Sequence, residues 1–446
     1  MYEAAIPCLH RRLAAEKGGA NTDAKNIFEQ YLTNQSVFRD RAVLEPSYLP
    51  DTLLHREAQI ERMASVLAPA LYGERASNML LFGNSGTGKT ACAKYIGKQL
   101  MSAALPKGDA PHPRYLYVNC QTADTHYGVL YGISTHLFAA EEVEQGAAPP
   151  PTGWSLDRVY RTIKSRLAGM RESVVIVLDE VDMFVKKSGD DALYSIMKLN
   201  EEEDGEKMIG ATKVSIIGIS NEVRFTELLD PRVRSRLSDE KIQFPPYNVD
   251  QLADILIQRA KHAFKEHCVD ESILSLCAAM EAKERGDARR AIALLRIAGE
   301  MADRYKEERI TERHVKMAYN TIERDCVIDA VDALTTQSKH ILLGIILNTE
   351  AGNDTLTTGD VYTTYYHLCK RTGLTPLSQR RVTDLISELD MQGLVNARVK
   401  SFGRGGRTKE ISLAVPNIID IKRTLEKDEF LSSVKGSLPK YQTKLV

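Results

Sequence analysis

Apolar and polar positions follow two different patterns between residues 79 and 219. Short apolar runs occur at four places, and between them apolar residues recur every three or four positions. The short runs are typical of buried strands, and the wider spacing indicates helices with one apolar face. Strands that alternate with helices favour a parallel sheet covered by helices on both faces. The predicted strands are residues 79–82, 115–118, 174–178 and 214–219.

The strand pattern ends after Pro245-Pro246, and the following part of the chain is helical. Four amphipathic stretches there predict a small all-helical domain. Further on, three helical stretches precede two alternating segments, a combination typical of a winged helix-turn-helix. The predicted helices are 250–264, 271–282, 287–304 and 311–324, then 338–348, 359–369 and 376–391; the alternating segments are 394–399 and 410–415.

The length of 446 residues leaves room for about three domains. The first 35 residues are polar and glycine-bearing, which predicts a poorly ordered arm. We therefore predict an α/β core followed by an all-helical domain and a winged helix. The predicted boundaries are 1–35 for the arm, 36–246 for the α/β base domain, 247–330 for the helical lid, 331–416 for the winged helix and 417–446 for the C-terminal tail.

Charge and cysteine content narrow the class of protein. Hydrophobic residues make up 43% and charged residues 27%, as in an ordinary globular protein. The net charge of −1 hides a basic C-terminal part, because residues 331–446 carry 16 Lys and Arg against 12 Asp and Glu. The seven cysteines form no C-x-x-C pair, and no apolar stretch approaches the ~20 residues of a membrane span. We expect a cytoplasmic protein with an anionic partner and no membrane contact.

Residues Gly83–Thr90 fill every fixed position of the phosphate-binding pattern G-x-x-x-x-G-K-[ST]. They follow a predicted strand and precede a predicted helix, which is the context that this loop requires. Glycines let consecutive N–H groups turn toward phosphate oxygens, and the helix presents its positive end to the same anion. We predict that ATP or ADP binds here with Mg²⁺, through Gly86, Thr87, Gly88, Lys89 and Thr90, with Lys89 on the terminal phosphates and Thr90 on the metal.

Two acidic residues end the third predicted strand. Asp179 is placed to hold Mg²⁺ together with Thr90, and Glu180 to polarise the attacking water. Asp182 either belongs to the same site or caps the turn. Asn221, after the fourth strand, either orients the same water or is a turn residue. The pattern favours the functional alternative for Asn221.

Arginines occur at two further places where phosphate chemistry needs them. Arg232, Arg234 and Arg236 lie two residues apart, and one of them could reach a nucleotide on a neighbouring subunit. Arg236 is our candidate; the alternative is a solvated basic helix. Arg289 lies in the first turn of a helix that Asp287 is expected to cap, where it could sense the γ-phosphate.

The order of these motifs resembles that of AAA+ ATPases. With the winged helix appended, the chain is similar to the archaeal replication-initiator family, most clearly over Phe38–Arg41, Pro50 with His55–Glu57, Gly83–Thr90, Leu178–Asp182, Asp230–Leu237 and Gly286–Ala291. The resemblance implies that an extended N-terminal segment packs against adenine, that Tyr247 and Arg259 contact the nucleotide, and that an insertion within Thr122–Phe138 touches DNA. It also implies double-stranded origin DNA, a replicative helicase and paralogous initiator subunits as partners, and a nucleoid-associated location.

The winged helix carries two candidate DNA-binding segments. The predicted helix 376–391, with Thr375 as its cap, exposes polar residues at its N-terminal end, where a recognition helix meets the major groove. The segment 398–409 contains five cations and no acid, with Phe402 and three glycines between them. Such a wing can lie along a minor groove. The candidate residues are Gln379, Arg380, Arg381, Arg398, Lys400, Arg404, Arg407 and Lys409.

Three functions fit these features. The first is an ATP-dependent replication initiator in which slow hydrolysis acts as a switch. The second is an ATP-switched transcription regulator that uses the same winged helix. The third is a clamp-loader or transposition-helper ATPase, which is disfavoured because neither usually ends in a basic winged helix.

Overall fold

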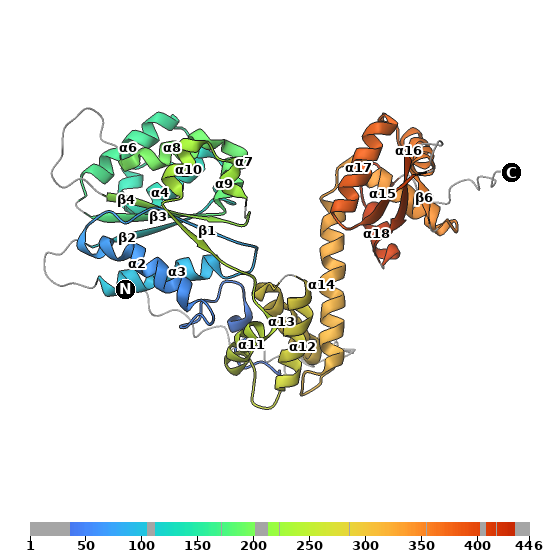
Figure 1. Cartoon of the computed structure of the whole chain (residues 1–446), viewed down its shortest axis with the longest axis horizontal. Helices are drawn as coiled ribbons and strands as arrows, with labels where there is room; N and C mark the ends of the chain where they lie inside the picture. The colour runs from blue at the N-terminus through green and yellow to red at the C-terminus, as the bar shows by residue number, and fades with distance from the viewer. Residues whose placement is uncertain are drawn as a thin grey trace, which may run out of the picture. The chain divides into compact units, whose positions relative to one another are not determined.

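The computed structural model describes residues 36–432 except for positions 105–111, 171, 201–212, 223, 285, 354, 402–406 and 416. The chain divides into two compact units, one up to Thr311 and one from Glu312 onward (Figure 1). No helix in the described part is both long and apolar enough to cross a membrane.

A five-stranded parallel sheet in the order β2-β3-β4-β1-β5 forms the centre of the first unit. The four predicted strands and the α/β class are confirmed. The sequence pattern missed β5 because its residues, Glu-Lys-Ile-Gln, bury only the isoleucine, as expected at a sheet edge. The strands are β1 Met79–Phe82, β2 Arg114–Asn119, β3 Ser173–Asp179, β4 Lys213–Ser220 and β5 Glu240–Gln243.

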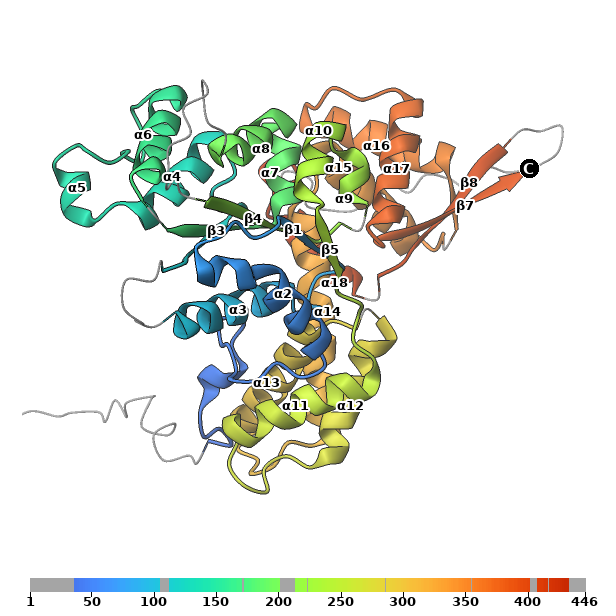
Figure 2. The same ribbon diagram turned by 60° about the vertical axis from the view of Figure 1, so that its left-hand side comes forward.

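Helices cover both faces of this sheet (Figure 2). Along β3, Val174, Ile176 and Leu178 enter one apolar cluster, whereas Val175 and Val177 enter the other. Burial on both faces explains why β3 is an unbroken apolar run. On one side lie α2 (Glu57–Leu67) and α3 (Lys89–Ala103); on the other lie α4 (His126–Leu137), α6 (Leu156–Ala168), α7 (Val181–Ser188), α8 (Asp190–Met197), α9 (Phe225–Leu228) and α10 (Pro231–Leu237).

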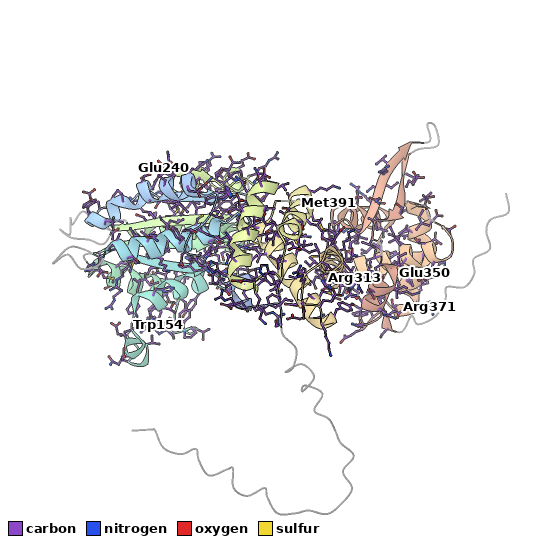
Figure 3. The ribbon with its side chains drawn as sticks, turned by 90° about the horizontal axis from the view of Figure 1, so that it is seen from below. Trp154, Glu240, Arg313, Glu350, Arg371 and Met391 are labelled. Carbon is purple, nitrogen blue, oxygen red and sulfur yellow. The ribbon has the colours of Figure 1, made fainter. Side chains whose placement is uncertain are left out.

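The stretch Thr122–Phe138, where the resemblance implies a DNA-contacting insertion, lies between β2 and β3. It contains α4, which Thr125 caps and which buries Val129, Leu130 and Ile133 in the core; its role as an insertion that touches DNA stays a prediction. A short helix, α5 (Ala140–Glu144), follows before α6. Beside the start of α6 lies Trp154 (Figure 3), and the guanidinium of Arg158 lies 3.7 Å from the centroid of its ring. The inward face of α4 therefore covers the sheet.

Three helices complete the first unit: α11 (Val249–Ala263), α12 (Glu271–Glu284) and α13 (Ala288–Tyr305). Asp287 caps α13, as expected, by accepting from the N–H groups of Arg289 and Arg290. The fourth predicted helix is α14 (Glu312–Asp332), which is longer than expected and belongs to the second unit. The domain boundaries proposed from the sequence stay predictions.

The second unit combines helices with a three-stranded antiparallel sheet in the order β6-β8-β7. The two-residue strand β6 was too short to predict. The buried stripe expected on the third helix, formed by Val382, Leu385, Ile386 and Leu389, is confirmed. The elements are α15 (Thr336–Glu350), β6 (Leu356–Thr357), α16 (Thr358–Thr372), α17 (Gln379–Met391), β7 (Val395–Ser401), β8 (Arg407–Leu413) and α18 (Ile418–Leu425).

The predicted start of the third helix was wrong. Helix α17 begins at Gln379, and Ser378 is its N-cap, instead of Pro376 and Thr375. The Ser378 hydroxyl accepts from the Arg381 N–H, whereas the Leu377 N–H donates to the Tyr365 hydroxyl on α16. A tertiary hydrogen bond therefore holds the preceding turn outside the helix.

Candidate nucleotide site and DNA-binding surface

The loop Gly83–Thr90 joins β1 to α3, and its glycines are required by geometry. Gly83, Gly86 and Gly88 have φ angles of 149°, 72° and 92°, where other residues are strained. A Cβ atom on Gly83 would lie 2.3 Å from the Phe244 carbonyl oxygen, and one on Gly88 would lie 2.8 Å from the Tyr247 hydroxyl. The loop is therefore curled against the chain that leads toward α11.

Lys89 lies at the centre of this curl. Its side chain is almost fully buried, and Nζ donates to the carbonyl oxygens of Gly83 (2.8 Å) and Asn84 (2.7 Å). Burial lowers the pKa of Lys89 to about 8, and nearby Arg289 acts in the same direction. A buried ammonium without a carboxylate in hydrogen-bonding contact is stabilised by an arriving anion. The residues present thus fit a phosphate group.

Thr90 and Asp179 meet as predicted. The Thr90 hydroxyl donates to Asp179 Oδ2 at 2.9 Å, and the Tyr117 hydroxyl donates to the same oxygen at 2.5 Å. A hydroxyl and a carboxylate are the hard oxygen ligands that Mg²⁺ prefers. The sequence interpretation missed Tyr117. Tyr117 could have been found from its position: its side chain carries a hydroxyl, and it lies two residues before the end of β2. Strand β2 pairs with β3 through Asn119 and Asp179.

Glu180 and its neighbours form the acidic end of β3. Glu180 has a φ of +58°, a left-handed conformation that is unusual for this residue. Burial, and then the charges of Asp179 and Asp182, raise its pKa. Asp182 is buried in the first turn of α7 and accepts from the Asn221 N–H at 3.4 Å, so it connects the ends of β3 and β4. Asn221 is exposed and lines a hollow with Asn84 and Ser85.

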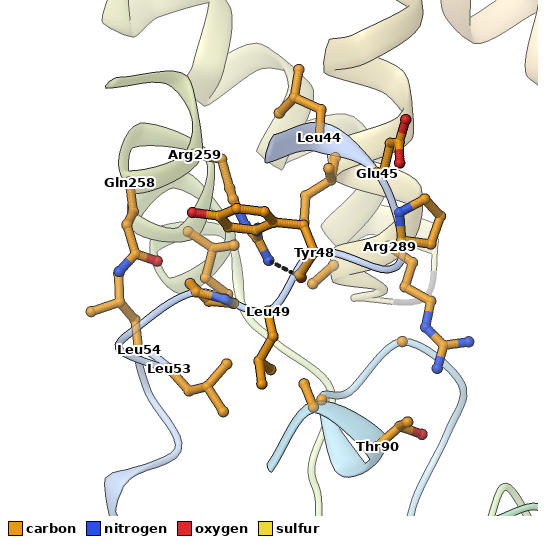
Figure 4. Close-up of a pocket in the computed structure, with 18 of the residues that line it drawn as sticks. Leu44, Glu45, Tyr48, Leu49, Leu53, Leu54, Thr90, Gln258, Arg259 and Arg289 are labelled. Atoms are coloured by element: carbon orange, nitrogen blue, oxygen red, sulfur yellow. Dashed lines mark hydrogen bonds between the residues drawn. The ribbon is translucent and has the colours of Figure 1, made fainter. Parts of the chain in front are cut away.

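A second hollow adjoins the phosphate loop and is lined mainly by the segment 44–54, α11 and α13 (Figure 4). Arg259 lies at its wall, 9% exposed, and donates to the carbonyl oxygens of Val43 (3.0 Å) and Tyr48 (3.3 Å). Its Nε atom has no partner in the described structure. Tyr247 also lines this hollow. The structure thus places both residues beside the site, and their contact with a nucleotide stays a prediction.

The start of α13 meets the phosphate loop directly. The Ala288 N–H donates to the Gly86 carbonyl oxygen at 3.2 Å, and a Cβ atom on Gly86 would overlap the Asp287 carboxylate. Arg289 is exposed, and in Figure 4 its guanidinium extends from α13 toward the loop that ends at Thr90. This arrangement suits the phosphate-sensing role predicted for Arg289.

Arg236 does not line the nucleotide site of its own chain. Its guanidinium lies 5.1 Å from the ring centroid of Tyr194, and Arg232 is paired with Asp230 at 3.1 Å. A role of Arg236 toward a neighbouring subunit therefore stays a prediction.

The candidate DNA-binding residues gather on α17, β7 and β8. Gln379 and Arg380 are exposed and line a groove with Thr383, Thr408 and Lys409.

Arg381 is exposed but faces acids on its own helix, Asp384 at 3.9 Å and Glu388 at 3.7 Å. Lys409 Nζ donates to Ser387 and packs against α17. Arg398 is exposed opposite Glu410; Lys400 and Arg407 belong to the strands, and Arg404 lies outside the described residues.

Three family descriptions match successive parts of the chain. They are an AAA ATPase domain over residues 52–204, a Cdc6 AAA+ ATPase-type lid domain over 253–320 and a CDC6 C-terminal winged helix domain over 329–421. These matches agree with the sheet, the helices after it and the helix–sheet unit described above.

Known proteins resemble the chain over most of their length. An ORC1-type DNA replication protein of Methanoculleus marisnigri is 46% identical over 393 residues, which are 87% of this chain and 90% of that protein. One from Thermococcus onnurineus is 47% identical over 390 residues, 87% and 91% of the two chains. The solved structure of the Aeropyrum pernix ORC1 protein in complex with DNA covers 90% of this chain and 99% of its own, at 41% identity and a TM-score of 0.76. The chain therefore belongs to the ORC1-type family of DNA replication initiators, with a nucleotide-binding AAA+ core, a Cdc6-type lid and a winged helix.

Proposed function

We propose that the chain is an ATP-controlled initiator that binds double-stranded origin DNA and helps to recruit the replicative helicase. The observation that supports nucleotide control is the contact between Gly86 and Ala288. It brings the phosphate loop and the start of α13, with Arg289, into one site. A γ-phosphate added there changes the charge that Arg289 faces, so ATP and ADP favour different positions of the helices around α13.

ATP or ADP with Mg²⁺ is the proposed ligand. Gly86, Thr87, Gly88 and Lys89 would hold the phosphates, and Thr90 and Asp179 would hold the metal, which would supply charge neutralisation. Glu180, the neighbour of Asp179, is the residue that we propose to polarise water, and Asn221 is the one that we propose to orient it. We expect slow turnover, because the proposed role of hydrolysis is to end one binding state.

DNA binding is assigned to α17 and the wing between β7 and β8. Arg380 is our candidate for base contacts because it is exposed on the groove, and the cations of residues 398–409 are candidates for phosphate contacts. The Aeropyrum pernix ORC1 protein was solved in complex with DNA, which supports DNA binding by the present chain. Paralogous subunits are proposed partners for the arginines of α10.

The test is to compare DNA binding by the whole chain with ATP, with ADP and without nucleotide. We expect the mode or affinity of binding to origin repeats to differ between ATP and ADP, and footprints to show duplex distortion there. Footprints confined to promoter operators would favour the transcription-regulator alternative. DNA binding that ignores both nucleotides would contradict the proposal.

Substitution of Tyr117 by phenylalanine is expected to weaken the metal site alone. The change removes one of the two hydroxyls that hold Asp179 Oδ2. We expect the Mg²⁺ concentration for half-maximal nucleotide binding to rise by about tenfold or more, because one hydrogen bond to a charged group contributes about 1.5–3 kcal/mol. Nucleotide binding without Mg²⁺ should not change. Tyr115→Phe is the matched control, because the Tyr115 hydroxyl donates to the Ala93 carbonyl oxygen instead; equal effects of the two changes would contradict the assignment.

A further inference from the structure

Arg56 is a buried cation that no part of the proposed chemistry uses. It is 2% exposed and stands at the N-cap of α2. Nε donates to the Thr87 carbonyl oxygen at 2.9 Å, Nη1 to that of His55 at 2.9 Å and Nη2 to that of Pro245 at 2.7 Å. Its guanidinium also lies 3.7 Å from the ring centroid of Tyr247. The planar guanidinium fork thus holds three chain segments at fixed relative positions.

The first of these segments is where the N-terminal part of the chain reaches the α/β base. Before Arg56, the chain is fastened to the helices after the sheet: Asp303 accepts from Ser36 and Val37, and His55 bonds Asp254 of α11 at 2.8 Å. From α2 onward the chain packs on the sheet. The chain passes from the helices to the base at His55, which has a left-handed φ of +60°. Such a conformation persists only where the surroundings fix it.

The second segment is where the chain leaves the base. The Phe244 N–H still donates to the Phe82 carbonyl oxygen of β1, whereas the Tyr247 N–H donates to Gly286, one residue before the cap of α13. Pro245, between them, accepts from Arg56. The chain thus connects the α/β base to helices α11–α13 at two places, near His55 and near Pro245, and the Arg56 guanidinium donates to a carbonyl oxygen at each.

The third segment is the phosphate loop itself. Thr87 is fully buried, its carbonyl oxygen accepts from Arg56, and a Cβ atom on the next residue, Gly88, would lie 2.8 Å from the Tyr247 hydroxyl. In the described chain Arg56 forms no ion pair. Its positive charge is therefore stabilised by the three carbonyl oxygens and by the Tyr247 ring. Charge-assisted hydrogen bonds in a buried site are strong and tolerate little displacement.

We infer that Arg56 is a positioning residue that couples the phosphate loop to the angle between the α/β base and helices α11–α13. This inference rests on the proposed nucleotide control. A phosphate that draws the Thr87–Gly88 peptide toward itself moves one acceptor of the fork. The other two acceptors, at both connections, then move with it, and the start of α13 is repositioned over the nucleotide.

Amide hydrogen exchange of the whole chain, with saturating ATP, ADP or no nucleotide, tests this coupling. The two peptides of interest are residues 83–93, around the phosphate loop, and 286–296, at the start of α13. Arg56→Lys keeps the charge but loses the three-way fork, and Arg56→Gln loses both. Arg62→Lys is the matched control: it lies on the same helix, is 59% exposed and pairs only with Glu240 among the described contacts.

In the unmodified protein we expect nucleotide to protect both peptides. In Arg56→Lys we expect residues 83–93 to stay protected at saturating nucleotide, while the protection of 286–296 by nucleotide falls by about tenfold. In Arg56→Gln the protection of residues 286–296 by nucleotide should fall further, and Arg62→Lys should match the unmodified protein. The difference in DNA binding between ATP and ADP should shrink in the same order.

Two results would overturn the inference. One is equal nucleotide protection of both peptides in Arg56→Lys and the unmodified protein. The other is a loss of protection throughout the base without nucleotide, which would make Arg56 a residue of fold stability only. An unmodified protein whose α13 peptide ignores nucleotide would instead refute the proposed nucleotide control, so the two failures are distinguishable.

Discussion

Replacing Lys89 with alanine is expected to lower the affinity for ATP and ADP by about a hundredfold, the cost of removing one partner from a buried charge pair. The Lys89 ammonium is held between the Gly83 and Asn84 carbonyl oxygens at the centre of the loop. A bound phosphate would be its anionic partner, and no other buried cation occupies that centre in the described structure. Fluorescent ATP and ADP analogues measure the loss directly.

The pH dependence of binding gives an independent check on the same residue. The pKa of Lys89 is lowered to about 8 by burial, and a bound phosphate raises it again by stabilising the ammonium. Above pH 8 binding therefore takes up a proton, and the affinity should fall by up to about tenfold per pH unit. Lys98→Ala, an exposed lysine on the same helix, should change neither the affinity nor its pH profile. An unchanged affinity in Lys89→Ala would exclude the loop as the phosphate site.

The sequence predicted those parts of the candidate site that each lie on a short local segment. Gly83–Thr90 follows β1, and Asp179 and Glu180 lie at the end of β3; the apolar runs of both strands are unbroken because the strands are buried on both faces. Arg56 and Tyr117 act through partners far along the chain, so no local pattern marked their roles. Strand β5 was not predicted for a related reason, because an edge strand needs few apolar residues.

The boundaries of elements depended on tertiary contacts in the same way. Ser378 and Thr375 are both good N-caps, and sequence alone favoured the one followed by proline. The choice is made by Tyr365 on α16, whose hydroxyl takes the Leu377 N–H. As a result, Arg380 lies in the first turn of α17, at the end where a recognition helix meets bases.

Neutralising the wing is expected to produce the largest change in DNA binding. Strands β7 and β8 pair from Val395 with Leu413 to Ser401 with Arg407, so the described part of this hairpin ends at Ser401 and Arg407. The double change Arg404→Ala and Arg407→Ala should weaken binding to all sequences alike, because phosphate contacts carry no sequence information. The slope of log affinity against log salt should become shallower by about two units, one for each lost phosphate contact.

Two comparisons separate this effect from a general loss of charge. Lys422→Ala with Arg423→Ala removes the same charge from α18, where Lys422 pairs with Glu350 and Arg423 is 73% exposed, and should leave the salt slope unchanged. Arg380→Ala should alter base preference at a cost of about 1–3 kcal/mol per lost contact. Arg381→Ala should have less effect, since Arg381 already faces Asp384 and Glu388. An unaltered slope in the wing variant would place the wing outside the interface, because counterion release follows the number of phosphates neutralised and not the overall charge of the protein.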